Sequence, residues 1–262
     1  MEQAHQPAVP ADAFLSVTGL RRDFGGVWAC ADATFGLRRG VITSLIGPNG
    51  AGKSTVVGIV GGAIAPSGGR VVFDGADITA MPPHQRARAG LVRTYQLSSE
   101  FGRLTVLENL LVAAPGQRGE RMRTLVYGKR YWRSQEQELL DRARLLQNRF
   151  AMSHMEDEYA SNLSGGQKRL LEIMRALMCQ PKLLLLDEPM AGVNPTLARV
   201  IEGYLADLAA EGLTMLLVEH EIGLVERLSE SVIVMAQGKV IAIGSMPDLR
   251  ARPEVLNAYL AG

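Results

Sequence analysis

One glycine-rich stretch near residue 50 restricts the fold and chemistry of this chain more than any other segment. It fits the phosphate-binding pattern G-x-x-x-x-G-K-[ST] at every fixed position. Its residues are Gly47, Pro48, Asn49, Gly50, Ala51, Gly52, Lys53, Ser54 and Thr55. An apolar, β-branched run over 41–46 precedes it, and a segment able to form a helix follows over 54–60. This strand–loop–helix context distinguishes a phosphate loop from a chance match.

The residue types in this loop suit a nucleoside triphosphate with Mg²⁺. Glycines let the backbone curl around an anion, so that its N–H groups point inward at the positive end of the following helix. Lys53 is expected to reach the β- and γ-phosphates, and the Ser54 hydroxyl to ligate Mg²⁺. We therefore expect ATP and Mg²⁺ as cofactors.

A second glycine loop lies at Leu163–Gln167 and begins another predicted helix. Ser164 is a suitable N-cap, and apolar residues follow at helical spacing. Free amides at a helix N-terminus form an anion site, which predicts a second phosphate contact. The contact residues would be Ser164, Gly165, Gly166 and Gln167.

Acidic residues follow a second apolar run, 183–186. Asp187 would bind Mg²⁺, and Glu188 would orient and deprotonate the attacking water. The alternative is that the two acids cap the next helix, which the phosphate loop in the same chain disfavours.

A third apolar run, 214–218, ends at Glu219-His220. Ligands of open α/β sheets bind beyond the carboxyl ends of the strands, so His220 is predicted near the γ-phosphate. We expect the other histidines to be ordinary polar residues; these are His5, His84 and His154.

The two glycine loops also predict a dimer. One chain has two phosphate-binding loops but a single loop lysine and a single Asp-Glu pair. Two chains arranged head to tail would make two complete sites, each with one chain's phosphate loop and the other's Ser164–Gln167 helix. ATP would then join the subunits, and hydrolysis would release them.

Composition restricts the partners. The 262 residues include 28 Lys and Arg against 27 Asp and Glu, a net charge of +1, so we expect no nucleic-acid partner. No apolar run approaches the ~20 residues of a membrane span, so any work at a membrane requires a partner. Residues 1–12 lack an apolar signal region and are expected to be a disordered lead. Cys30 and Cys179 have no metal-like spacing and suit a reducing cytosol.

The N-terminal part predicts an antiparallel sheet beside the parallel one. Runs at 14–17 and 33–37 alternate like strands, and Asp74-Gly75 and Gln237-Gly238 are hairpin turns. Phe24 lies before a Gly-Gly turn, where it is either a core aromatic or a stacking surface for a base.

Residues 97–163 have a helical, charged character. Thr105 and Glu108 form a capping box, and 135–150 is predicted to be one amphipathic helix. A basic run covers Arg118–Arg133. A solvated insertion explains this run better than a surface for a partner or for lipid headgroups.

Five motifs occur along the chain in the order seen in ABC-type ATPases: the phosphate loop, Gln96 after Arg93-Thr94-Tyr95, Leu163–Gln167, Leu183–Glu188 and His220. The resemblance covers the chain from about Phe14 to its end. The resemblance implies an α/β P-loop NTPase (RecA-like) core with a mainly parallel sheet, an antiparallel β subdomain and an inserted helical subdomain. A single nucleotide-binding domain would cover 13–262, with its core at 13–96 and 164–262 and its helical subdomain at 97–163. Phe24 would stack on adenine, and Gln96 would sense Mg²⁺ and the water while linking to a membrane partner. Glu188 would be the catalytic base, and His220 would hold the γ-phosphate.

Within that family, the chain is most similar to the ATP-binding subunits of branched-chain amino acid importers. The supporting segments are 92–96, 104–110, 191–195, the insertion near 115–155 and the closing 258–260. Asn194 stands where most ABC ATPases have aspartate, but asparagine is usual at this position in the importer branch that the chain resembles. Glu221 and Met190 also differ from the commoner residues, aspartate and alanine, at positions without a catalytic role.

This resemblance implies an ATPase that powers uptake of small, branched-chain amino acids from the cytoplasmic face of the membrane, as a peripheral subunit. Its partners would be a second ATPase subunit, transmembrane permease subunits and, indirectly, an extracytoplasmic solute-binding protein. Two alternatives stay open: an ATPase of a lipid or lipopolysaccharide exporter, and an ABC ATPase of DNA repair or translation. The long helical region disfavours the first. The single cassette without a coiled-coil array disfavours the second.

Overall fold

The computed structural model describes residues 9–10, 12–94, 100–116 and 130–260. Gln96, the basic segment 118–129 and most of the predicted N-terminal lead lie outside them. Two compact units divide the chain. The first comprises Met1–Arg93, Lys182–Met190 and Glu202–Gly262, and the second comprises Thr94–Pro181 and Ala191–Ile201.

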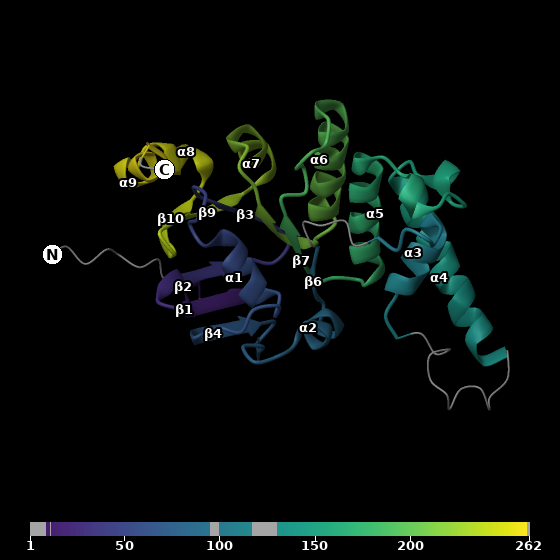
Figure 1. The fold of residues 1–262 in the computed structure, drawn as a ribbon, viewed down its shortest axis with the longest axis horizontal. Coiled ribbons are helices and arrows are strands. Elements are labelled where there is room, and N and C mark those ends of the chain that lie inside the picture. The colour runs from purple at the N-terminus through teal and green to yellow at the C-terminus, as the bar shows by residue number, and fades with distance from the viewer. Residues whose placement is uncertain (1–8, 11, 95–99, 117–129, 261–262) are drawn as a thin grey trace. The chain divides into compact units, whose positions relative to one another are not determined.

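The described part of the first unit holds one ten-stranded sheet, in the order β5-β4-β1-β2-β10-β9-β3-β8-β7-β6 (Figure 1). Its strands are β1 Leu15–Phe24, β2 Val27–Leu37, β3 Ile42–Ile46, β4 Gly68–Phe73, β5 Ala76–Asp77, β6 Leu91–Arg93, β7 Leu183–Asp187, β8 Thr214–Val218, β9 Ser231–Ala236 and β10 Lys239–Gly244.

The parallel part of this sheet carries the strands that end at the predicted site. β3 lies between β9 and β8, and β8, β7 and β6 follow in parallel pairing. Every residue of β3, β7 and β8 is buried, as expected for strands covered on both faces. The sequence runs that precede the phosphate loop, the Asp-Glu pair and His220 are therefore neighbouring strands.

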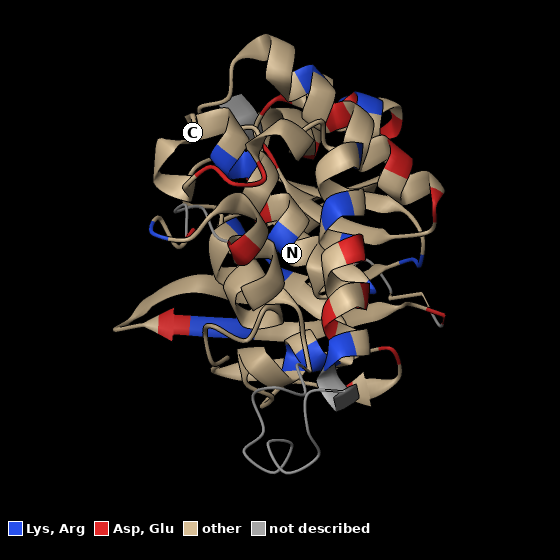
Figure 2. Ribbon diagram, turned by 90° about the vertical axis from the view of Figure 1, so that its right-hand side faces the viewer, with Lys and Arg blue, Asp and Glu red and all other residues tan. Residues whose placement is uncertain are grey.

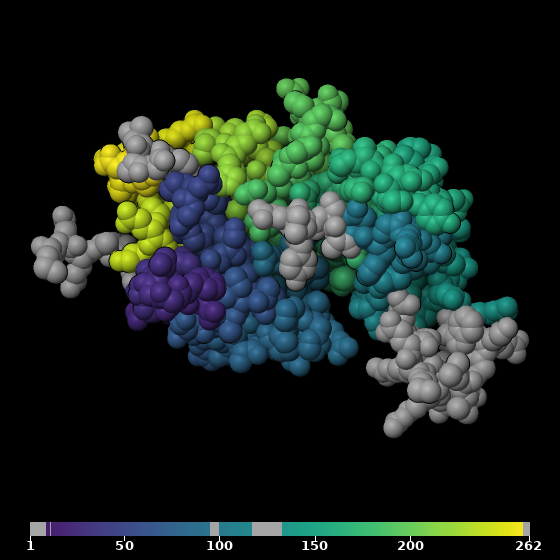
Figure 3. Space-filling model, viewed as in Figure 1, coloured from purple at the N-terminus to yellow at the C-terminus, as the bar shows by residue number. Residues whose placement is uncertain are grey.

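The antiparallel part is formed by β1, β2, β4 and β5, and a parallel pair between β10 and β2 joins it to the rest. Figure 3 accordingly shows the yellow-green surface of the C-terminal strands beside the purple N-terminal strands. Both predicted hairpin turns are confirmed, because Asp74-Gly75 connects β4 to β5 and Gln237-Gly238 connects β9 to β10. All four turn residues have positive φ, as a type I′ turn requires.

Helices pack on this sheet, and the first of them follows the phosphate loop directly. The helices of the first unit are α1 Lys53–Val60, α2 Pro83–Ala89, α7 Ile222–Leu228, α8 Met246–Arg250 and α9 Pro253–Leu260. The buried face of α1, including Val56 and Ile59, joins side chains of β1, β2 and β3 in one apolar cluster. This packing fixes the helix whose N-terminus faces the phosphate loop.

The second unit is helical and contains α3 Val106–Ala113, α4 Arg130–Arg149, two 3₁₀ turns at Ser153–Met155 and Ala160–Asn162, and α5 Gly165–Met178. A further helix, α6 Pro195–Ala210, begins in this unit and ends in the first. The Thr105–Glu108 capping box is confirmed at α3. The predicted amphipathic helix is also confirmed, although it begins at Arg130 rather than Gln135.

The described helices include none that is both long and apolar enough to cross a membrane. Basic and acidic residues are interspersed over the part of the chain visible in Figure 2.

Candidate nucleotide-binding site

The phosphate loop connects β3 to α1 and packs closely against two backbone segments. A Cβ added to Gly47 would lie 2.1 Å from the Met235 carbonyl oxygen, and one added to Gly52 would lie 2.2 Å from the Ala29 carbonyl oxygen. Gly47 has a φ of 152° and Gly52 a φ of 98°. These positions require glycine for conformation and for space. The loop therefore keeps its curled shape through contacts with β2 and β9.

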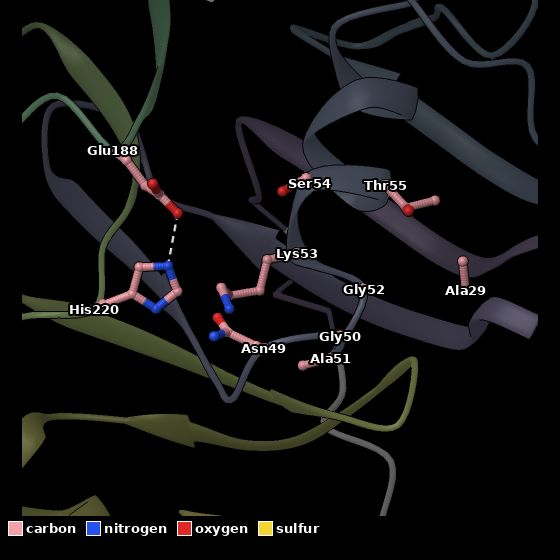
Figure 4. Close-up of a pocket in the computed structure, with 10 residues that line it drawn as sticks. All are labelled: Ala29, Asn49, Gly50, Ala51, Gly52, Lys53, Ser54, Thr55, Glu188 and His220. Carbon is pink, nitrogen blue, oxygen red and sulfur yellow. Dashed lines mark hydrogen bonds and ion pairs between the residues drawn. The ribbon is translucent and has the colours of Figure 1, made fainter. Parts of the chain in front are cut away.

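The loop forms one wall of a pocket with a volume of about 250 Å³ (Figure 4). The pocket is lined by Ala29, Asn49, Gly50, Ala51, Gly52, Lys53, Ser54, Thr55, Glu188 and His220. The structure thus brings together the loop and two residues that follow β7 and β8. Ala29 has no sequence signal, because its part in the site is a backbone contact with Gly52.

Lys53, the first residue of α1, is a buried cation within this pocket. Its Nζ donates hydrogen bonds to the carbonyl oxygens of Gly47, at 2.8 Å, and Pro48, at 3.0 Å. Burial lowers the pKa of Lys53, while the charges of Glu188 and Asp187 oppose this shift. Two neutral carbonyls do not fully offset the free-energy cost of burying the Lys53 ammonium, so binding of an anionic ligand is favoured here.

Asp187 ends β7, with only 1% of its surface exposed. Its Oδ2 accepts a hydrogen bond of 3.0 Å from Nη2 of Arg93, the last residue of β6. Its Oδ1 is buried and has no hydrogen-bond partner among the described residues. A buried carboxylate oxygen without a partner is costly unless a ligand uses it.

The donor set suits Mg²⁺ held jointly with phosphate. No group of three or more His, Cys, Asp or Glu side chains in the described residues is arranged to hold a metal ion. Mg²⁺ is commonly bound through one or two carboxylates, substrate phosphates and water. The free Oδ1 of Asp187 and the exposed Ser54 hydroxyl on the first turn of α1 fit that requirement.

Glu188 and His220 face the loop from the other side of the pocket (Figure 4). His220 Nε2 lies 2.6 Å from Glu188 Oε1. Glu188 has a φ of 50°, in the left-handed region that non-glycine residues seldom adopt. Its backbone N–H donates a hydrogen bond to the Val218 carbonyl at 3.0 Å. With the backbone in this conformation, the Glu188 carboxylate reaches the His220 imidazole (Figure 4).

The remaining predicted site residues lie elsewhere. Phe24 ends β1 with 47% of its surface exposed, and the Arg22 guanidinium covers its ring at 4.6 Å. Phe24 does not line the pocket. Ser164, Gly165, Gly166 and Gln167 form the N-terminus of α5 in the second unit.

At that N-terminus, Ser164 and Gln167 form a capping box. The Ser164 N–H donates to Gln167 Oε1 at 2.8 Å, and the Gln167 N–H donates to Ser164 Oγ at 3.4 Å. A Cβ on Gly166 would lie 2.1 Å from Leu197 Cδ2, whereas one on Gly165 would meet nothing within 4 Å. The contact with Leu197 thus explains why residue 166 is a glycine. Beside Gly165 the structure leaves open space.

Residues 30–191 match the family model described as ABC transporter. This chain belongs to the ABC transporter family. A probable branched-chain amino acid transport ATP-binding protein, LivG, of Archaeoglobus fulgidus is 41% identical over 94% of this chain and 95% of its own length. The high-affinity branched-chain amino acid transport ATP-binding protein LivG of Escherichia coli is 38% identical, over 94% and 97%. The resemblance inferred from the motifs is confirmed.

Solved ATP-binding cassettes of ABC transporters share this fold. One in its ADP conformation superposes with a TM-score of 0.82 at 35% identity, covering 95% of this chain and 99% of its own. A nucleotide-free cassette gives 0.81 at 35% identity, covering 94% and 98%. The predicted fold class, a P-loop NTPase of the ABC type, is therefore confirmed.

Proposed function

We propose that this ABC family member is the ATP-hydrolysing subunit of a membrane importer of small, branched-chain amino acids. The transport assignment rests on relatives that are 36–41% identical over 94% of this chain and are named for branched-chain amino acid transport. Hydrolysis is supported by a single observation, the convergence of the phosphate loop, Glu188 and His220 on one pocket. The relatives' names do not favour the exporter alternative.

In this proposal, the loop amides and Lys53 bind the phosphates of ATP, and Phe24 stacks on the adenine. Ser54, Asp187 and Gln96 hold Mg²⁺, which would neutralise phosphate charge when bound. Glu188 accepts the proton of the attacking water, and His220 orients the Glu188 carboxylate and contacts the γ-phosphate. The 2.6 Å contact between His220 Nε2 and Glu188 Oε1 supports these roles.

The proposed assembly has two ATPase subunits at the cytoplasmic face of the membrane. Ser164, Gly165, Gly166 and Gln167 of each subunit contact the ATP bound to the partner's phosphate loop. Permease subunits form the transmembrane path, and an extracytoplasmic binding protein delivers the amino acid. The open space beside Gly165 at the N-terminus of α5 supports a phosphate contact there.

Glu188→Gln tests the hydrolytic role. The amide has nearly the same shape but cannot accept a proton, so we expect turnover to fall by about 10²–10⁴-fold while ATP binding is kept. Phosphate release and fluorescent-nucleotide binding measure the two quantities. Glu221→Gln is the control, since Glu221 is exposed and lies outside the pocket. Retained turnover in Glu188→Gln would exclude Glu188 as the base.

The transport assignment needs a separate experiment. The chain, its partner ATPase subunit and its permease would be reconstituted in vesicles, with the solute-binding protein and labelled leucine added, and with glutamate as the control solute. We expect ATP-dependent leucine accumulation that Glu188→Gln removes. ATP hydrolysis without movement of any branched-chain amino acid would contradict the importer assignment and leave the ATPase assignment standing.

A further inference from the structure

Glu219, the residue directly after β8, has a buried carboxylate that the proposed mechanism does not use. Only 6% of its surface is exposed. Oε1 accepts a hydrogen bond from the Met190 N–H, and Oε2 accepts one from the His220 N–H, each at 3.3 Å. One side chain thus bonds to two separate backbone segments.

These two segments carry the paired side chains of the pocket. His220 belongs to one, and Met190 lies two residues after Glu188 in the other. The Glu188 N–H also donates to the Val218 carbonyl at 3.0 Å. The backbone over 188–190 is therefore attached to the end of β8 at both of its ends, by Val218 and by Glu219.

The attachment matters because Glu188 has a φ of 50°. A left-handed conformation is unfavourable for a non-glycine residue and persists only where the surroundings hold it. Burying a carboxylate is also unfavourable, and burial raises the pKa of Glu219 while its bonds from the Met190 and His220 amides oppose that rise. Nearby Glu188 raises this pKa further, and His220 lowers it.

We propose that Glu219 is a positioning residue, whose carboxylate holds the backbones of Glu188 and His220 in the relation that lets their side chains meet. The effect of Glu219 on turnover rests on the proposed ATPase function. Its effect on the contact between Glu188 and His220 does not. Removing the carboxylate would leave both segments in place through β7 and β8 but would loosen the contact between Glu188 and His220.

Glu219→Gln is the matched change, because the side chain keeps its length and shape. Its amide has one acceptor oxygen and an NH₂ group that repels the second backbone N–H, so one of the two bonds is lost. In the nucleotide-free protein, ¹⁵N NMR of the imidazoles reports the environment of His220 Nε2. His220→Gln assigns that signal among the four histidines of the chain.

We expect the His220 Nε2 signal to move in Glu219→Gln and to stay unchanged in Glu221→Gln. Glu221 is the control because it is the next acid along the chain, is exposed and makes no side-chain cap bond to α7. In steady-state assays, kcat should fall at least about tenfold in Glu219→Gln, while ADP affinity changes less than about threefold.

An unchanged His220 signal would overturn the proposal, whatever happens to turnover. A parallel loss of kcat and ADP affinity would also overturn it, because it would indicate general damage to the pocket. If Glu219→Gln does not fold, hydrogen exchange of the Met190 and His220 amides in the unmodified protein tests whether Glu219 holds these two backbone segments. Slow exchange supports the proposal, and exchange at the rate of an open loop overturns it.

The NMR result also separates this proposal from the proposed function. If the unmodified protein hydrolyses no ATP, the ATPase assignment fails, while the His220 signal still tests positioning by Glu219.

Discussion

Gly52 illustrates how single residues set the shape of the phosphate loop. A side chain at this position would meet both an unfavourable φ of 98° and the Ala29 carbonyl oxygen at 2.2 Å. Backbone cannot withdraw as a flexible side chain can, so the loop itself would have to move. The contact therefore links loop geometry to β2.

Gly52→Ala should weaken nucleotide binding by at least about tenfold, because displacing the loop misaligns its amides. Fluorescent-nucleotide titration measures the effect. Gly75→Ala is the control, since Gly75 has a φ of 79° but its Cβ would meet nothing within 4 Å. That variant should lose only about 1 kcal/mol of stability and bind nucleotide normally. Equal nucleotide affinities in the two variants would contradict this account.

Cys30 is a residue whose reactivity follows from burial. It is fully buried, its Sγ donates to the Leu20 carbonyl at 3.0 Å, and burial raises its pKa from 9.0 to about 11. We expect iodoacetamide at pH 8 to leave Cys30 unmodified in the native protein and to label it in urea, as mass spectrometry would measure. Rapid labelling of native Cys30 would be inconsistent with this environment.

The same pKa shift predicts a pH dependence of stability. The unfolded state loses the thiol proton near pH 9 and the native state near pH 11. Stability from this group is therefore complete below pH 9 and is lost as pH rises from 9 to 11. Urea denaturation of Cys30→Ala should show a smaller decline over that window than the unmodified protein.

At the scale of elements, the phosphate-loop helix α1 is fixed at both ends. Its N-terminus forms the loop, and its C-terminal carbonyls accept hydrogen bonds from the buried Arg86 of α2. Arg86 Nη1 lies 2.6 Å from the Ile59 oxygen and 2.7 Å from the Val60 oxygen. Burial lowers the pKa of Arg86. A cation at this negative end of the helix is favourable.

Arg86→Met should destabilise the protein by about 3 kcal/mol, because it leaves several buried carbonyls without a donor. Arg88→Met on the same helix removes an exposed arginine and should change stability by less than about 0.5 kcal/mol. Urea denaturation gives both values. Equal stabilities would mean that Arg86 does not act as the cap of α1.

Helices and strands were predictable where the local pattern of apolar residues determines them. The runs at β3, β7 and β8 are apolar throughout because a covered parallel strand has no exposed face, and each meets a functional residue at its end. No local sequence pattern indicated the roles of Glu219 and Arg86. Their roles depend on carbonyls and amides that the fold brings to them from Met190, Ile59 and Val60.

Predictions of the site were limited in a similar way. Sequence pattern located the phosphate loop, Glu188 and His220, and the structure places them around one pocket. Ala29 was missed because a backbone carbonyl leaves no trace in residue type. The start of α4 was placed too late, since the residues from Arg130 lack the apolar spacing on which the helix prediction rested.

At the scale of the whole molecule, the proposed dimer makes a prediction about Ser164. Ser164→Arg places a large cation in the proposed shared site, so ATPase activity should be lost while the isolated subunit still binds nucleotide. Since Ser164 also caps α5, Ser164→Ala is the control: it removes the cap, worth about 1 kcal/mol, without adding bulk. Activity and single-subunit binding are the readouts. Loss of nucleotide binding by the isolated Ser164→Arg subunit would contradict the shared site.

The position of β3 in the sheet has a consequence for how this protein is made. β3 ends at Ile46, whereas its two hydrogen-bonding neighbours, β8 and β9, are synthesised later and begin only at Thr214 and Ser231. The antiparallel strands β1, β2 and β4 can pair long before that. Until β8 and β9 have been made, the nascent chain therefore carries an apolar strand with both edges unpaired, which exposes it to non-native pairing during that interval.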